Sequence, residues 1–291
     1  MSGTTNQDYL LKQKTARLSV YSNTLLVVGK LIIGIMTGTV SIISEAIHSG
    51  VDLLASVIAF IAVKKSDTPP DSDHDYGHGK VENVSAAVEA LLIIIAGLYI
   101  IVESVDKLRY PRTPEDLHWA ILIMLISCIT NQIISQKLFR IGEKTGSEAL
   151  KADGQHLQSD VWTSAGVMVG LILMQISGFM WLDPFIAIAV AIIVLRVGYT
   201  MSKKCYYLLT DASLNQAEEE KIIHIILQNP QVLGYHKLRT RLAGNTAIMD
   251  FHLELPCDLP LEKAHAITRE IETALKQQYG PCDPTIHIEP R

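Results

Sequence analysis

Residues 44–52 read Ser44-Glu45-Ala46-Ile47-His48-Ser49-Gly50-Val51-Asp52 and place a His and an Asp four residues apart within the apolar segment Val40–Val63. On a helix, positions i and i+4 lie one above the other on the same face. An ionisable pair inside a membrane-length helix is energetically costly, so by default it marks a functional site. This stretch therefore predicts a membrane-spanning helix in which His48 and Asp52 form part of a functional site.

A second pair with the same spacing, His156 and Asp160, stands directly before the apolar run Val161–Ile176. Two such helices facing each other would offer two imidazoles and two carboxylates, from His48, Asp52, His156 and Asp160. That is a four-coordinate set for a divalent transition metal, with Zn²⁺ first and Fe²⁺, Co²⁺, Cd²⁺ or Mn²⁺ as further candidates. No cysteine accompanies the four, which argues against Cu(I). The alternative is structural: the pairs hydrogen-bond to each other or to neighbouring helices.

The same four side chains predict a coupling between metal and protons. Each ligand must lose its proton before it binds a metal. Binding of metal therefore expels protons, and protonation expels metal. Imidazole titrates near physiological pH, which suits such an exchange.

The remaining apolar segments predict an all-α bundle of six transmembrane helices. The chain has 291 residues, 48% of them hydrophobic, and a positive mean hydropathy. A crossing needs about 20 residues, and the fifth segment reaches that length only if the polar turn holding His156 and Asp160 is helical. The six segments are Leu18–Thr37, Val40–Val63, Val84–Val105, Leu117–Ile134, Ala149–Ile176 and Phe185–Met201.

Charged residues indicate the orientation of these segments. Lys and Arg gather before the first segment and after the second, fourth and sixth, and the loop 107–112 is the exception. The positive-inside rule then places both termini in the cytoplasm. The net charge of −5 provides no basic field for nucleic acid. The four Cys lack the spacing of a disulfide framework.

After Lys204 the chain changes to frequent charges and short periodic apolar segments. We expect a helix over 215–228, strands over 236–242 and 246–255, a helix over 261–279 and a strand over 284–288. This order suits a small α+β sandwich. The expected organisation is an N-terminal cytoplasmic segment 1–16, a transmembrane domain 17–204 and a cytoplasmic domain 205–291.

The loop after the second segment is dense in possible metal ligands and reads Asp71-Ser72-Asp73-His74-Asp75-Tyr76-Gly77-His78-Gly79-Lys80. Asp71, His74 and His78 can converge on one ion, with Asp73 or Asp75 supporting them from outside. The alternative is a solvated acidic loop with incidental histidines.

The C-terminal domain offers a third set of ligands. His236, His252 and His287 fall on or beside the three expected strands, and Glu289 follows the last. Pairing of the strands in one sheet would bring these side chains together, which predicts a regulatory metal site. The alternative is that each is an ordinary polar residue. Further polar residues such as Glu89 fall inside the expected spans, where they are candidates for lining a water path.

These features together resemble the cation diffusion facilitator family and are similar to its bacterial zinc/iron efflux branch. The resemblance covers nearly the whole chain and rests on the six spans, the two His-x-x-x-Asp pairs, Tyr76-Gly77-His78-Gly79-Lys80 and Leu238-Arg239-Thr240-Arg241. It implies a homodimer in a bacterial inner membrane that exports divalent metal in exchange for protons by alternating access. It also implies that the C-terminal domain is ferredoxin-like, with an αββαβ order.

The resemblance also assigns residues. It maps a transport site onto His48, Asp52, His156 and Asp160, and a loop site onto Asp71, His74 and His78. It implies two ions near the dimer contact, held by His236, His252, His265, His287 and Glu289, and a charge interlock between Lys80 and Asp211. That branch often has Asp in place of His48, and Asp is usual in place of Glu289. The His form resembles zinc-preferring members.

Two other classes of function stay open. A membrane metal sensor or scaffold would bind metal without gradient-driven flux. An intramembrane metalloenzyme would need an open zinc position and a nearby general base, but both carboxylates are already used as ligands. The expected function is therefore a proton-coupled zinc exporter, a secondary transporter with no organic cofactor.

Overall fold

The computed structural model describes residues 2–37, 40–110, 117–177, 179 and 181–291. Within these ranges, the described part excludes the side chains of residues 2–6, 34, 37, 40–45, 47–48, 51, 117–120, 167, 170–171, 174–175 and 183. The chain forms two compact units, Met1–Tyr206 and Tyr207–Arg291.

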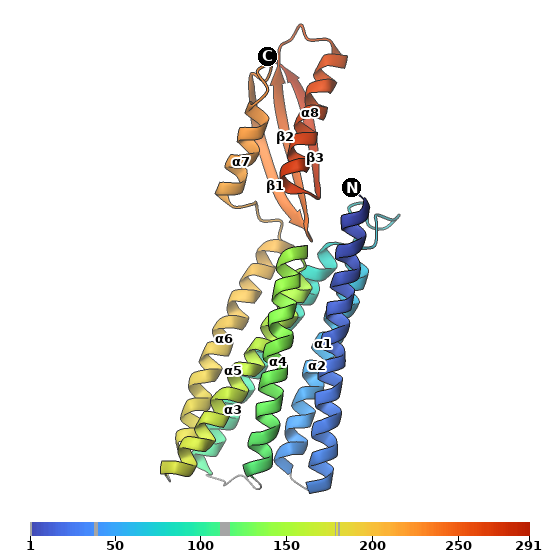
Figure 1. Ribbon diagram of the computed structural model, residues 1–291. Coiled ribbons are helices and arrows are strands. Elements are labelled where there is room, and N and C mark those ends of the chain that lie inside the picture. Colours follow the sequence, from blue (N-terminus) through green and yellow to red (C-terminus); the bar gives the residue numbers. More distant parts are fainter. Residues whose placement is uncertain (1, 38–39, 111–116, 178, 180) are drawn as a thin grey trace. The chain divides into compact units, whose positions relative to one another are not determined.

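Six long helices build the first unit (Figure 1): α1 (Ser2–Thr37), α2 (Val40–Ser66), α3 (Lys80–Arg109), α4 (Leu117–Thr145), α5 (Glu148–Ser177) and α6 (Leu182–Leu209). Four stretches of the described residues are long and apolar enough to cross a membrane, namely Gln7–Ile33, Lys80–Arg109, Ile121–Thr145 and Pro184–Leu209. The other two helices, α2 and α5, have 27 and 30 residues and carry buried polar groups. α5 continues unbroken through positions 156 and 160, so the polar turn is helical.

The packing of these helices places α2, α3 and α5 against one another. Small apolar side chains such as Ala62 on α2, Ala90 on α3 and Ala152 on α5 are almost fully buried in the clusters of this unit. Small side chains let helix backbones approach closely. Large apolar side chains such as Leu25 and Ile95 instead remain exposed, as lipid-facing positions require. The interior where α2, α3 and α5 meet is therefore the place for buried chemistry.

The second unit is a ferredoxin-like α+β domain. Its elements are α7 (Gln216–Leu227), β1 (Gly234–Ala243), β2 (Thr246–Leu255), α8 (Leu261–Tyr279) and β3 (Cys282–Pro290). The sheet has the order β1-β2-β3, with β1 antiparallel and β3 parallel to β2 (Figure 1). The Asn215 side chain accepts a hydrogen bond from the Glu218 amide and caps α7. Gly244, with φ +64°, turns the chain between β1 and β2.

The two faces of this sheet differ in character. Along β2, Met249, Phe251, Leu253 and Leu255 are buried in a core with side chains of α7 and α8. Successive side chains on a strand point to opposite faces. The intervening residues of β2, Asp250, His252 and Glu254, therefore occupy the face away from the helices, and that face carries the polar chemistry of the domain.

Candidate metal sites

Three ionisable side chains from two helices converge inside the first unit: Asp52 on α2 and His156 and Asp160 on α5. We call them the membrane group. One ligand atom from each lies within 4.8 Å of the others. Nε2 of His156 is 3.3 Å from Oδ1 of Asp52. Asp52 and His156 are only 6% and 3% exposed. The helical spacing of His156 and Asp160 puts both on the face of α5 that meets Asp52.

His48, the fourth predicted ligand, lies on α2 one turn before Asp52. Its side chain is outside the described part of the structure, so its membership of the group remains a prediction. A helical spacing of four residues places both positions on one face of α2.

The membrane group is chemically suited to bind a cation. Buried carboxylates are costly unless a positive charge or a proton compensates them. The Nδ1 atom of His156 is buried and makes no hydrogen bond with any described residue. Imidazole nitrogen and carboxylate oxygen are a donor set that divalent zinc and its neighbours in the first transition row accept. The group is therefore a candidate site for a divalent cation.

A chain of hydrogen bonds links α1, α2 and α5 one turn away from this group. Nδ2 of Asn23 donates to Oγ of Ser56 at 2.6 Å, and Ser56 donates in turn to Oδ1 of Asp153 at 3.0 Å. Oγ of Ser19 lies 3.1 Å from the same Ser56 hydroxyl. These bonds hold the helices in register beside the membrane group.

The loop between α2 and α3 brings together Asp71, His74 and His78, which we call the loop group. One ligand atom from each lies within 4.8 Å of the others. Nδ1 of His74 and Nε2 of His78 are each 3.4 Å from the Asp71 carboxylate. His78 is buried, whereas the other two are exposed.

Local backbone geometry explains how the loop group forms. Gly77 has φ +75°, a conformation that favours glycine, and its amide donates to the carbonyl of His74. This turn brings His78 back to Asp71. The backbone amides of Asp73 and His74 both donate to Asp71 Oδ1, and the bond from Asp73 lowers the pKa of the Asp71 carboxyl. Asp75 and the carboxylate of Asp73 do not belong to the three-residue group.

The third collection of ligands lies on the sheet. His236, His252 and Glu289 form the sheet group, again with ligand atoms within 4.8 Å. His252 Nδ1 is 2.6 Å from Glu289 Oε1, and this hydrogen bond lowers the pKa of the Glu289 carboxyl. His236 Nε2 is 3.2 Å from Glu289 Oε2. The strand register produces this arrangement, because His236, His252 and His287 are directly paired across the three strands.

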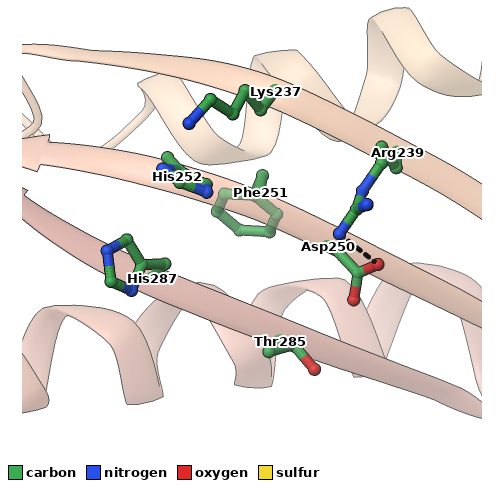
Figure 2. Close-up of a pocket in the computed structure, with 7 residues that line it drawn as sticks. All are labelled: Lys237, Arg239, Asp250, Phe251, His252, Thr285 and His287. Atoms are coloured by element: carbon green, nitrogen blue, oxygen red, sulfur yellow. Dashed lines mark ion pairs between the residues drawn. The ribbon is translucent and has the colours of Figure 1, made fainter.

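His287 lies at the edge of the sheet group, with Nε2 3.7 Å from Glu289 Oε1 and its ring centroid 4.7 Å from that of His252. Figure 2 shows His252 and His287 on neighbouring strands, close to the ion pair of Arg239 and Asp250. These residues help to line a pocket with Lys237, Phe251 and Thr285. The imidazole rings of three strands thus share one face of the domain.

Sequence reasoning missed Glu254, whose Oε1 is 3.1 Å from Nδ1 of His236. The register explains this contact: Gly234 pairs with Glu254 and His236 with His252, so His236 and Glu254 are diagonal neighbours on one face. A β-bulge follows in β1, because Arg239 pairs with Asp250 and β1 therefore has one extra residue. Lys237, with φ +53°, lies in this bulge. The alternation of carboxylates two residues from each histidine on β2 and β3 was the signal that could have identified Glu254.

The resemblance also implies roles for His265 and for the pair Lys80 and Asp211, which lie outside the three groups. His265 lies on α8, is exposed and is not part of the sheet group. Lys80 and Asp211 belong to different units, so their interlock stays a prediction. Within the second unit, Nη1 of Arg241 donates to Oδ1 of Asp211 at 3.2 Å.

Comparison with known proteins agrees with this architecture. The cation efflux transmembrane domain matches residues 16–210, and the cytoplasmic domain of cation efflux proteins matches residues 214–291. The chain therefore belongs to the cation efflux, or cation diffusion facilitator, family, and it is an integral membrane transporter for cations. Its resemblance to that family, inferred from the motifs, is confirmed.

Individual relatives cover most of the chain. An uncharacterized transporter of Synechocystis is 35% identical over 88% of this chain and 83% of its own length. The cation-efflux pump FieF of Shewanella oneidensis is 30% identical over 100% of this chain and 97% of its own length. A solved structure of CzrB, 36% identical, covers 27% of this chain and 99% of that chain, with a TM-score of 0.27.

Proposed function

We propose that this protein exports divalent transition metal, Zn²⁺ first, from the cytoplasm in exchange for protons. The observation that carries the proposal is the membrane group, in which two carboxylates and one imidazole from α2 and α5 lie within 4.8 Å inside the helical unit. His48 is the expected fourth ligand. A four-coordinate shell of nitrogen and oxygen favours Zn²⁺ over Mg²⁺, which requires six oxygens. Fe²⁺, Co²⁺, Cd²⁺ and Mn²⁺ are the alternative substrates.

The exchange follows from competition at the membrane group. With the group open to the cytoplasm, a metal ion displaces protons from His156 and the carboxyl groups. With the group open to the other side, protons displace the ion. Alternating access of this kind needs only that the helices rearrange around a fixed site. The direction of transport is then set by the proton gradient.

The rest of the proposal concerns architecture. We infer a homodimer in a bacterial inner membrane with both termini in the cytoplasm, consistent with the family description of residues 214–291 as a cytoplasmic domain. The loop group and the sheet group, with His265 and His287, would bind further ions that stabilise the dimer or regulate transport. The interlock of Lys80 with Asp211 would join the two units.

Reconstitution in vesicles tests this proposal. Zinc uptake under an imposed pH gradient would be followed with a fluorescent indicator for the wild type and for Asp160→Asn. Because the substitution removes one ligand charge, we expect uptake to fall to the level of empty vesicles. The matched control is Glu103→Gln, which removes an exposed charge on α3 that pairs with Lys107 at 3.2 Å. Wild-type uptake by Asp160→Asn would contradict the assignment. Zinc binding without gradient-driven uptake in the wild type would favour a membrane sensor or scaffold.

A further inference from the structure

Two acidic side chains beside the membrane group are completely enclosed. Glu89 on α3 and Asp153 on α5 are both 0% exposed. Each has one oxygen bonded to a serine, since Ser85 donates to Glu89 Oε1 at 3.2 Å and Ser56 donates to Asp153 Oδ1 at 3.0 Å. The second oxygen of each, Glu89 Oε2 and Asp153 Oδ2, is buried without a hydrogen-bond partner among the described residues. Neither carboxyl group is used by the membrane group itself.

The electrostatic surroundings of this pair are unusual for buried acids. Glu89, Asp153 and the imidazole of His156 lie close enough to interact electrostatically. Asp153 also interacts electrostatically with the carboxylate of Asp52 on α2. The Cys205 thiol on α6 interacts in the same way with the carboxyl group of Glu89. In the described part of the chain, no lysine or arginine forms an ion pair with either acid. Among the described residues, the basic group that acts on both acids is His156, a prospective metal ligand.

These surroundings determine the protonation of the pair. A buried carboxylate without a compensating charge is strongly disfavoured, and two neighbouring carboxyl groups cannot both ionise at low cost. A divalent ion on the adjacent membrane group would reverse this balance, because charges interact strongly in a poorly hydrated interior. The pair should hold protons while the membrane group is empty and lose one when a cation binds there.

We propose that Glu89 and Asp153 are a second proton-binding pair that takes part in metal exchange, alongside the metal ligands. When a divalent cation binds, the O–H bond of one carboxyl group breaks, its electron pair stays on the oxygen, and the proton passes to water. When the cation leaves, a proton from water restores the O–H bond. The role of this pair in transport rests on the proposed function, whereas its release of protons on metal binding is an equilibrium property.

A count of released protons tests the inference directly. The purified full-length protein would be titrated with Zn²⁺ in weakly buffered solution containing a pH indicator. We expect the double variant Glu89→Gln/Asp153→Asn to release fewer protons at saturation than the wild type, by about one per chain, because neither acid is left to supply that proton. The slope of the logarithm of zinc affinity against pH should fall in the same way. Glu103→Gln, on the same helix but exposed, should match the wild type. All other metal-binding groups are unchanged, so their protons cancel in the comparison.

A second measurement keeps the test decisive if the double variant fails to fold. In the wild type, an infrared difference spectrum on zinc addition should lose intensity in the C=O band of protonated carboxyl groups, and the double variant should lose less. Unchanged proton release in the folded double variant, or an unchanged wild-type infrared band, would overturn the inference. A wild type that releases protons on binding but shows no gradient-driven uptake would instead refute the proposed function alone.

Discussion

Glu82, in the first turn of α3, is the most extensively bonded buried charge in the described part of the first unit. Its Oε1 accepts from Ser66 Oγ at 2.7 Å and from Lys12 Nζ at 3.4 Å. Its Oε2 accepts from Ser147 Oγ at 2.5 Å and from the amide of Ala149 at 3.4 Å. One carboxylate thus joins α1, α2, α3 and the start of α5. We predict that Glu82→Ala strongly destabilises the first unit.

The magnitude follows from burial and from what is left behind. Glu82 is 4% exposed and Lys12 is 5% exposed. Removing one partner of a buried ion pair typically costs about 3–5 kcal/mol. Lys12 keeps its second partner, since its Nζ is 2.8 Å from Asp67 Oδ1, and the Ser66 hydroxyl keeps the Val63 carbonyl at 3.1 Å. The Ser147 hydroxyl and the Ala149 amide lose the carboxylate as acceptor. We therefore expect Glu82→Ala to lower the unfolding free energy by about 3 kcal/mol, near the lower end of that range. Glu82→Gln keeps one carbonyl acceptor and should cost less.

Denaturant unfolding in mixed micelles would measure these losses, with the unfolding free energy extrapolated linearly to zero denaturant. Asp67→Asn is the control, because Asp67 is partly exposed and Lys12 retains Glu82 in that variant. The control should lose no more than about 1 kcal/mol. A loss below about 1 kcal/mol for Glu82→Ala would refute the reasoning, because it would mean that the four contacts contribute no net stability.

Two predictions concern the other groups. Asp71→Asn should weaken zinc binding at the loop group at least about tenfold, because it removes the only carboxylate of the group. Calorimetric titration would measure the affinity, and the neighbouring Asp75→Asn should show no such change. The pKa of Glu289 is lowered below the ordinary value of 4.5 by the bond from His252, so its contribution to stability is complete above that value and disappears as the pH falls through the lowered pKa. Hydrogen-exchange protection of β2 and β3 should therefore decline in this acidic range for the wild type and change less for Glu289→Gln; equal profiles would contradict the prediction.

The arrangement of the C-terminal domain was largely predictable from local sequence. The amphipathic spacing over 261–279, followed by Gly280, predicts α8 with the bounds that the structure shows. β2 has the predicted bounds, whereas β1 starts earlier, at Gly234, and β3 is longer and runs over Cys282–Pro290. Both are longer because main-chain pairing continues past the apolar residues. Register is harder to infer. The bulge at Lys237 and the bond of His236 to Glu254 depend on pairing that no periodicity reports.

In the first unit, sequence reasoning picked out the polar residues on α5. A paired His and Asp directly before an apolar run predicted that α5 carries candidate ligands, and the structure brings His156 and Asp160 to Asp52. It failed where partners are distant in the chain. Lys12 and Glu82 are 70 positions apart, and Asp153 attracts notice only when α3 places Glu89 beside it. Helical periodicity gives the face of each helix but not its neighbours.

Simultaneous recording of zinc uptake and proton efflux in the same vesicles tests the central claim most directly. For the wild type, with zinc added outside and no imposed gradient, the two signals should rise together with a constant ratio. Both should vanish in Asp52→Asn. Zinc uptake without proton movement, or both signals persisting in Asp52→Asn, would contradict exchange at the membrane group.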